Sequence, residues 1–396
     1  MPASRTIVIA GAGIGGLTAS LVLAAQGFHV VVFDTVKRLE PIGAGIQLSP
    51  NATRVLIAMG LGERLKPHVV VPTELVVKLA RTGDVLARVP LGEATVERYG
   101  APYWVVHRGD LQSELCLAAS EAPNIELRLG TKVDNFAAHA NGIMLEVSRG
   151  MSVTLDHADV LVCADGLWSS LRQHIGHRQK PKFARHTAWR TLVPASAAPA
   201  ESRIPAVNLW LGRKAHLVHY PVKDGNMINI VAILRDDWNE PGWDSAGLRR
   251  DVLDRFSAGS WHAAVRDLLK ASQNWQKWAL FDCAPLRQWG SGPITLLGDA
   301  AHPTLPYLAQ GAAMAIEDAA VLGKWLAIAP DDIPGALRRY ELTRRRRTNS
   351  VQRAARQNGF IYHLGGSELL LRALARWTMG DDKILQRYDW LYAWQP

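Results

Sequence analysis

Residues 6–34 read TIVIAGAGIGGLTASLVLAAQGFHVVVFD, and this stretch decides the fold. Thr6 to Ala10 is a short apolar run rich in β-branched residues, glycines follow it, and residues from about 15 to 26 carry a helical pattern. A second run of strand-forming residues extends from His29 to Phe33, and Gly27 stands where the end of a helix favours positive φ. The stretch therefore predicts strand, tight turn, helix and strand in succession.

The turn carries three spaced glycines whose roles differ. Gly11 permits the tight turn, Gly13 lets the backbone approach a pyrophosphate, and Gly16 allows the helix to pack closely. The N–H groups at the start of the helix would face the phosphates, and Asp34 ends the second strand, where an acid can accept hydrogen bonds from a ribose. A glycine-rich turn without a ligand is the alternative. Strand, helix and acid in register favour a dinucleotide site, but they do not separate FAD from NAD.

Two further acids stand at the ends of later predicted strands. Asp165 follows an apolar run in VCADG and precedes Ser169 and Arg172, and Asp299 follows another in GDAAHP. The carboxylate of Asp299, placed at a strand end, can accept hydrogen bonds from a ribityl chain, although a turn or helix cap is the default interpretation of either acid alone. The helix predicted from about residue 311 begins with Gly311 and Ala312. Its positive end would face the same ligand and stabilise negative charge on a reduced flavin.

Together with GAGIQ at residues 43–47 and HRGDL at 107–111, these motifs resemble those of the single-component FAD-dependent aromatic hydroxylases. The resemblance is nearest to the members that act on 3-hydroxybenzoate, 6-hydroxynicotinate and salicylate, and it covers essentially the whole chain. It implies an α/β fold with a glutathione-reductase-like, Rossmann-type FAD-binding domain, an inserted β-sheet substrate domain and a helical C-terminus. It also implies noncovalent FAD, NADH or NADPH as a transient reductant, O2 as co-substrate and a C4a-hydroperoxyflavin as oxygen donor.

The resemblance also assigns residues to the site. By position, Arg108 and Gln47 would bind the FAD, Asp165 would lie near its pyrophosphate, and Pro303 would sit beside the isoalloxazine as part of the catalytic centre. Gln47 replaces an active-site histidine of the 6-hydroxynicotinate enzymes, and Pro306 replaces a catalytic glutamine of the 3-hydroxybenzoate enzymes. These departures leave the aromatic acid and the position of hydroxylation open.

A phenol is hydroxylated more easily once a base removes its proton, and the strand predicted after Lys214 offers one. Alternation places His216 and Tyr220 on one face and His219 on the other. In the similar 3-hydroxybenzoate enzymes, a histidine and a tyrosine occupy the first two positions in the substrate pocket. We therefore expect His216 to be the base or a substrate hydrogen-bond partner. The alternative is that His216 has a purely structural role. Tyr220, His219 and His302 are the alternatives.

The basic residues of the chain limit its partners. The net charge of +9 is compatible with nucleic acid, a membrane surface or small anions. The densest basic run, Arg344 to Arg347, follows apolar residues at helical spacing and lacks an aromatic platform, so we expect a solvated helix face and no nucleic-acid partner. Arg190 is a candidate for binding a substrate carboxylate, with a surface ion pair as the alternative.

The length of 396 residues and the 48% hydrophobic content predict two linked domains. Cofactor motifs on both sides of a strand-rich block indicate that the first domain is discontinuous. We expect the FAD-binding domain at 1–72, 100–182 and 284–345, the substrate domain at 73–99 and 183–283, and a C-terminal helical segment at 346–396. That last segment, which holds Trp377, Trp390 and Trp394, would pack back onto the body.

The three cysteines are widely spaced and lack zinc-type spacing, which predicts a cytoplasmic protein without a metal site. We find no signal peptide and no apolar run of ~18 residues, so we expect no integral membrane segment. The oligomeric state is open, a homodimer included. Three alternative functions also stay open. They are a same-fold FAD monooxygenase acting on a nonaromatic or polycyclic substrate, a non-catalytic flavin-binding regulatory protein, and a plain NAD dehydrogenase.

Overall fold

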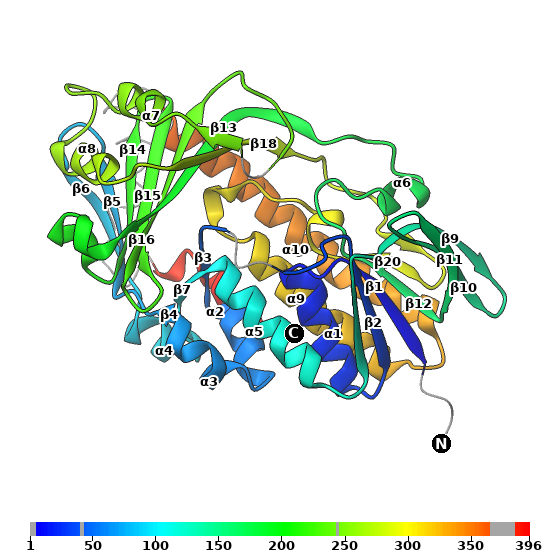
Figure 1. Cartoon of the computed structure of the whole chain (residues 1–396). Coiled ribbons are helices and arrows are strands. Elements are labelled where there is room, and N and C mark those ends of the chain that lie inside the picture. Colours follow the sequence, from blue (N-terminus) through cyan, green and yellow to red (C-terminus); the bar gives the residue numbers. More distant parts are fainter. Residues whose placement is uncertain (1–4, 40–42, 243–244, 365–384) are drawn as a thin grey trace.

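The computed structural model describes residues 5–39, 43–242, 245–364 and 385–396, and it places two large sheets with long helices between them (Figure 1). The first sheet is parallel except at one edge, and β1 pairs with both β2 and β12. Its strands are, in spatial order, β19 (Gly290–Ser291), β20 (Ile294–Leu296), β12 (Val160–Cys163), β1 (Thr6–Ala10), β2 (His29–Asp34) and β8 (Ile125–Leu129). The central strands are apolar throughout because helices and other chain cover both faces.

The helices on the first sheet pack unusually closely. Helix α9 (Gly311–Ile328) lies against α1 (Ile14–Ala25) and α10 (Ile333–Tyr362), and α5 (Arg108–Glu121) lies against α1. A Cβ on Gly15 would lie 2.9 Å from the Cβ of Ala315, and one on Gly323 would lie 2.3 Å from Val22. Larger residues at these two glycines would therefore push α9 away from α1.

The second sheet has eight strands and combines two separate segments of the chain. Strands β5 and β6 come from residues 73–99 and join the strands of residues 183–283 through parallel pairing of β5 with β14. The two segments expected to form the substrate domain thus contribute to one sheet, while the domain division itself stays a prediction. The spatial order is β17 (Ser245–Gly247), β18 (Trp275–Asp282), β13 (Lys182–Pro194), β16 (Met227–Arg235), β15 (Ala215–Val222), β14 (Ala206–Gly212), β5 (Glu74–Leu79) and β6 (Val85–Pro90).

Its two faces are buried against different partners. Along β14, Leu209 and Leu211 pack in an apolar cluster with Tyr220 and Tyr307, whereas Trp210 packs on the opposite side. We call the side of Tyr220 the inner face and the side of Trp210 the outer face. The inner face meets the loop before α9 and the end of α10, so it lies toward the first sheet and its helices (Figure 1).

Smaller elements complete the described chain. Strands β11 (Ser152–Ala158), β10 (Gly142–Arg149) and β9 (Lys132–His139) form one small sheet, and β3 (Gly45–Leu48), β7 (Trp104–His107) and β4 (Val69–Val70) form another. The shorter helices are α2 (Pro50–Ala58), α3 (Gly62–Leu65), α4 (Glu93–Tyr99), α6 (Leu171–His174), α7 (Arg249–Arg255), α8 (Ala263–Lys270) and α13 (Asp389–Tyr392). Single 3₁₀ turns are η1 (Lys66–His68), η2 (Ala195–Ala197), η3 (Ala200–Arg203), η4 (Gly298–Ala300) and η5 (Pro306–Leu308).

Helix α10 is continuous through the boundary expected between residues 345 and 346, so the backbone has no break there. Residues 365–384, including Trp377, lie outside the described part. The ring of Trp394 packs against the guanidinium groups of Arg344 and Arg347 of α10. In the described ranges, no helix is both long and apolar enough to cross a membrane.

The prediction that the arginine run forms a solvated face was wrong for two of its four members. Arg344 is fully buried and Arg347 nearly so, because they lie one helical turn apart on the side of α10 that faces α9. There they form ion pairs with two buried acids of α9, Glu317 and Asp318. Arg346 is exposed, as predicted.

Candidate active site

The glycine turn between β1 and α1 has a tight side and an open side. Gly11 has a φ of +115°, and its N–H donates to the carbonyl of Phe33 at 2.7 Å. A Cβ on Gly16 would lie 1.9 Å from the oxygen of Gly11, so that position accepts no larger residue. A Cβ on Gly13 would meet no atom within 4 Å. The turn therefore leaves open space at the glycine where a ligand's phosphate would approach.

Asp34 lies at the same turn. One carboxylate oxygen accepts the N–H of Ala12 at 2.7 Å, and the other accepts the N–H of Val36 at 3.0 Å. The side chain thus ties the end of β2 to the turn and remains half-buried. Its role toward a ribose stays a prediction.

The loop after β12 reaches the glycine turn, since a Cβ on Gly11 would lie 2.3 Å from the oxygen of Ala164. In this loop one oxygen of Asp165 accepts the N–H of Leu171 at 3.3 Å, and the other is buried without a partner. Burial raises the pKa of Asp165. An unpartnered buried carboxylate oxygen indicates that a donor is missing at this point.

Arg172 connects this loop to the third motif. Its guanidinium donates to the carbonyl of Ala300 at 3.1 Å and to that of Leu167 at 2.8 Å. The two acidic motifs, more than a hundred residues apart in sequence, are thereby held side by side.

Asp299 and Arg108 interact electrostatically in this region. The carboxylate of Asp299 makes no hydrogen bond with any residue of the described chain. Burial raises its pKa, and electrostatic interactions with His302 and Arg108 oppose the increase. Burial likewise lowers the pKa of Arg108, and Asp299 opposes that decrease. Both groups retain capacity to bind a polar ligand between them.

Helix α9 begins beside these groups. Its first residues, Gly311 and Ala312, are half-buried, and a Cβ on Gly311 would meet nothing within 4 Å. The preceding Gln310 is held by Ser49 at 2.8 Å and by Asn51 at 3.1 Å. The positive end of the helix dipole is therefore both fixed and accessible.

A buried ionic network under α9 accounts for His302. Asp318 accepts from the N–H of Gly298 at 3.0 Å, from His302 Nε2 at 2.5 Å and from Arg344 at 2.7 Å. Burial alone would raise the pKa of Asp318, but electrostatic interactions and hydrogen bonds with His302 and Arg344 lower it to about 2. One ring nitrogen of His302 is thus bound to an ionised carboxylate. These contacts hold His302 against the loop of Asp299, its Nδ1 is buried without a partner in the described residues, and a role as base stays an untested alternative.

Pro303 follows in that loop, and its carbonyl accepts a hydrogen bond of 2.8 Å from Gln352 of α10. The next turn, η5, carries Tyr307, whose ring packs on Gly359 of α10 and whose hydroxyl is buried without a partner. The chain therefore passes directly from the motif of Asp299 to the inner face of the second sheet.

Gln47 and Tyr220 meet where the two sheets approach each other. Tyr103 donates to the side-chain oxygen of Gln47 at 2.7 Å, and Gln47 also hydrogen-bonds Tyr220. Gly45 must be glycine here, because a Cβ would lie 2.6 Å from the ring of Tyr220. Burial raises the pKa of Tyr220. The side chain of Gln47, which was expected to bind the cofactor, thus has the two tyrosines Tyr103 and Tyr220 as its hydrogen-bond partners.

His216 lies on the inner face and is 2% exposed. Its Nδ1 lies 2.9 Å from Nε2 of His363, and the rings of Tyr307 and Tyr362 are 5.6 and 5.3 Å away. Its Nε2 makes no hydrogen bond within the described ranges. Burial, followed by the neighbouring histidines His363 and His186, lowers the pKa of His216 well below its usual value. The side chain is therefore neutral near pH 7.

Arg190 is on the inner face as well, with its guanidinium 3.5 Å from the ring centre of Trp278. It forms no ion pair with the residues described, so the surface ion pair considered for it is absent. Its Nε is buried without a partner, and burial lowers its pKa to about 9, with Tyr220 acting in the opposite direction.

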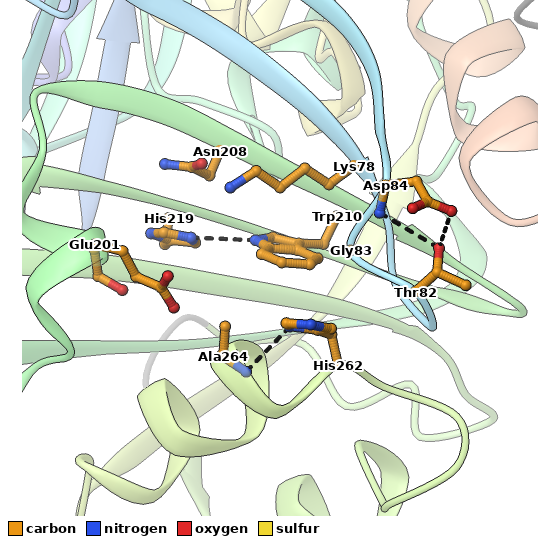
Figure 2. A pocket seen from close by; sticks show the side chains of 11 residues that line it. Lys78, Thr82, Gly83, Asp84, Glu201, Asn208, Trp210, His219, His262 and Ala264 are labelled. Atoms are coloured by element: carbon orange, nitrogen blue, oxygen red, sulfur yellow. Dashed lines mark hydrogen bonds between the residues drawn. The ribbon is translucent and has the colours of Figure 1, made fainter.

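His219 points to the outer face, as alternation predicts, and lines a pocket of about 240 Å³ there. Its Nε2 accepts from the indole N–H of Trp210 at 3.2 Å (Figure 2). Figure 2 also shows Lys78 and His262 on the two sides of that indole. Burial, followed by Lys78, lowers the pKa of His219 to about 3. His219 is separated from His216 by the sheet itself.

The open glycine turn, the two converging acidic loops and the accessible helix end define a dinucleotide-binding oxidoreductase. Residues 4–355 match the family described as FAD binding domain. The chain belongs to this family, within its FAD-dependent aromatic hydroxylases, which are monooxygenases that use NAD(P)H as reductant.

Individual relatives agree with this assignment. The chain is 34% identical over 395 residues to 3-hydroxybenzoate 6-hydroxylase of Polaromonas naphthalenivorans (strain CJ2), covering 99% of this chain and 97% of the relative. It is 32% identical over 368 residues to 6-hydroxynicotinate 3-monooxygenase of Pseudomonas fluorescens, covering 91% and 93%.

Solved structures agree as well. A salicylate hydroxylase in complex with substrate has a TM-score of 0.83 at 26% identity, covering 100% of this chain and 97% of that one. HpxO of Klebsiella pneumoniae, complexed with FAD and uric acid, has a TM-score of 0.85 at 25% identity, covering 98% and 97%.

Proposed function

We propose that the protein uses FAD, NADH or NADPH and O2 to hydroxylate a small aromatic or N-heteroaromatic carboxylic acid that carries a hydroxyl group. The observation that carries this proposal is a set of polar atoms without partners on the inner face, next to the cofactor loops. Within the described residues, the hydroxyl of Tyr307 and Nε of Arg190 are buried without a partner, and Nε2 of His216 makes no hydrogen bond. Aromatic rings surround them, as a flat and partly polar ligand requires.

The residues of the first domain fit FAD. Gly13 leaves room for the pyrophosphate, the free oxygen of Asp165 offers an acceptor near it, and Asp299 offers an unbonded carboxylate for ribityl hydroxyls. Arg108 and the start of α9 would hold the remaining negative charge. When bound and reduced, FAD supplies the activated oxygen.

On the substrate side, Arg190 would bind the carboxylate, since a guanidinium pairs with it in a planar, charge-assisted geometry. His216 would accept the phenolic proton on Nε2, because it is neutral and this nitrogen is free. Tyr220 and Tyr307 would orient the ring and its oxygen. Pro303 lies in the loop that joins these groups to Asp299, and its place beside the flavin belongs to the same proposal.

Incubation with FAD, each nicotinamide and a panel of hydroxybenzoates and hydroxypyridine carboxylates tests the proposal. Stimulated NAD(P)H oxidation together with a product heavier by one oxygen, identified by mass spectrometry, is the expected result. Stimulation by none of these acids would contradict it.

A second candidate is a same-fold monooxygenase with a nonaromatic or polycyclic substrate. The structural likeness to HpxO, solved with uric acid, favours testing purines in the same panel. The remaining alternative, a flavin-binding regulatory protein, requires that no added compound supports steady NAD(P)H oxidation. We also infer a cytoplasmic location, supported by three unpaired thiols.

A further inference from the structure

The proposed function makes no use of the pocket on the outer face of the second sheet. This pocket has a volume of about 240 Å³ and lies on the side of the sheet that carries Trp210. Pockets for drug-sized ligands have ~300–1,000 Å³, so an occupant of this one is smaller. The substrate groups Arg190 and His216 lie on the inner face, so a ligand here is separate from the substrate.

The register of three strands brings polar side chains together in this pocket. Asn208 of β14 pairs with His219 of β15. Two residues further along β14, Trp210 pairs with Lys78 of β5. Paired residues and residues two apart share a face, so these side chains all lie on the outer face. Figure 2 shows Lys78 and Asn208 on one side of the imidazole of His219 and Glu201 of η3 on the other.

Two buried hydrogen-bond donors of the pocket lack acceptors. The side-chain amide of Asn208 is 5% exposed and makes no hydrogen bond within the described residues. His219 accepts the indole N–H of Trp210 on Nε2, so the single proton of its ring is on Nδ1. Among the residues described, this Nδ1 is buried without a partner. Because buried polar groups are nearly always hydrogen-bonded, two such donors on one strand pair indicate an oxygen acceptor that the chain does not supply.

Lys78 and Glu201 provide opposite charges on the walls of the same pocket. The ammonium of Lys78 lies 4.9 Å from the ring centre of Trp210 and forms no ion pair with the described residues. Burial lowers the pKa of Lys78, and the charge of Glu201 opposes the decrease. Glu201 is exposed and likewise has no ion-pair partner within the described ranges. The two charges therefore interact across the pocket without closing an ion pair.

We propose that this pocket binds a small zwitterion of the amino-acid type. Its carboxylate accepts hydrogen bonds from the ammonium of Lys78 and the amide of Asn208, at the end where the buried donors lack acceptors. Its ammonium lies toward Glu201. One such ligand satisfies the cation, the acid and the buried donors together, whereas a simple anion or a simple cation satisfies only part of them. The proposal does not rest on the hydroxylase activity, because it uses no residue of the inner face.

The indole N–H of Trp210 reports on the pocket that it lines. The FAD-loaded protein is labelled with ¹⁵N-tryptophan, Trp210→Phe assigns the signal, and glycine, β-alanine and γ-aminobutyrate are titrated. These zwitterions differ only in the distance between their two charges. At least one should shift the signal saturably, and acetate and ethylamine, which carry one charge each, should bind at least ~10-fold more weakly than it. No saturable shift with any of the three zwitterions, or equal affinity for acetate or ethylamine, overturns the proposal.

Variants of the two charged residues complete the test. Lys78→Met should weaken the bound zwitterion ~10-fold or more. Glu201→Gln should weaken it ~3-fold or more, a smaller effect because this carboxylate is exposed and screened.

Lys277→Met is the matched control. The ammonium of Lys277 lies 4.2 Å from the ring centre of Trp238, and this lysine belongs to the same sheet but does not line the pocket. Its replacement should leave the affinity unchanged. Flavin content and the thermal unfolding midpoint show whether each variant is folded, and Glu201→Gln gives the reading if Lys78→Met is not. Unchanged affinity in the folded pocket variants, or an equal loss in Lys277→Met, contradicts the site.

Discussion

The two faces of β15 carry buried histidines three residues apart whose hydrogen-bond partners differ. His219, on the outer face, bonds Trp210 of the neighbouring strand and so belongs wholly to its own sheet. His216, on the inner face, bonds His363 at the end of a helix that also supports the cofactor loops. Both have lowered pKa values. A buried histidine with a lowered pKa is therefore not enough to indicate catalysis. What distinguishes His216 from His219 is the element that carries its hydrogen-bond partner.

Replacing His216 by Ala should give the largest effect. We expect hydroxylation to fall by ~10²–10⁴-fold and hydrogen peroxide release to rise, because the phenol keeps its proton while reduction of the flavin needs no base. The measurement is product formed per NAD(P)H consumed, with flavin content as the control. Unchanged coupling would transfer the role to Tyr220.

Asp299→Ala separates loss of the cofactor from loss of the base. It should weaken FAD binding by ~1–3 kcal/mol, the scale of a hydrogen bond to a charged group. Titration of the apoprotein with FAD measures the change, and Asp299→Asn, which keeps one acceptor oxygen, should lose less. Equal affinity in all three proteins would show that Asp299 does not bind the flavin.

Arg190→Met tests whether the inner face binds a carboxylate. Loss of a charge-assisted hydrogen bond of ~1.5–3 kcal/mol should raise KM by ~10–100-fold with little change in kcat. Arg190→Lys should recover part of the affinity. A KM equal to that of the parent for every acid of the panel would place the carboxylate elsewhere.

His219→Gln should have the smallest effect on turnover, within ~2-fold, because the glutamine oxygen can still accept from Trp210. Its effect appears in the pH dependence of stability. The pKa of His219 is about 3 when folded and ~6.5 when unfolded, so the unfolded state binds the extra proton between these values.

Stability of the parent therefore decreases as pH falls from ~6.5 toward 3 and gains nothing from this group above ~6.5. Urea unfolding at pH 6.5 and 5 should show a decrease that is smaller in His219→Gln by up to about 1.4 kcal/mol per pH unit. Parallel pH profiles would indicate that His219 is accessible to protons in the folded protein.

The fold and the cofactor loops follow from local sequence. The turn at Gly11 and the strand alternation of His216 against His219 depend on neighbours a few residues away, so they can be read from the chain. The partner of His216 cannot, since His363 lies 147 positions further on. Tyr103 and Tyr307 were missed for the same reason.

The burial of Arg344 was missed although a signal existed. Glu317 and Asp318 stand as adjacent acids in a helix whose only other charged residue is Lys324, and buried acids require cations. A basic run at helical spacing in the next helix was the natural source. Reading the two helices together, rather than the basic run alone, would have predicted the ion pairs.

The unbroken length of α10 has a consequence for which changes in chain length the protein can tolerate. Between Arg344 beneath α9 and His363 beside His216 the helix spans 19 residues, or ~28 Å at 1.5 Å per residue. Deleting one residue there would turn His363 by ~100° and draw it back by ~1.5 Å. The length of this stretch fixes the distance between the ion pairs of Arg344 and the contact of His363 with His216. Insertions or deletions within it should therefore abolish activity, even where nearby loops tolerate them.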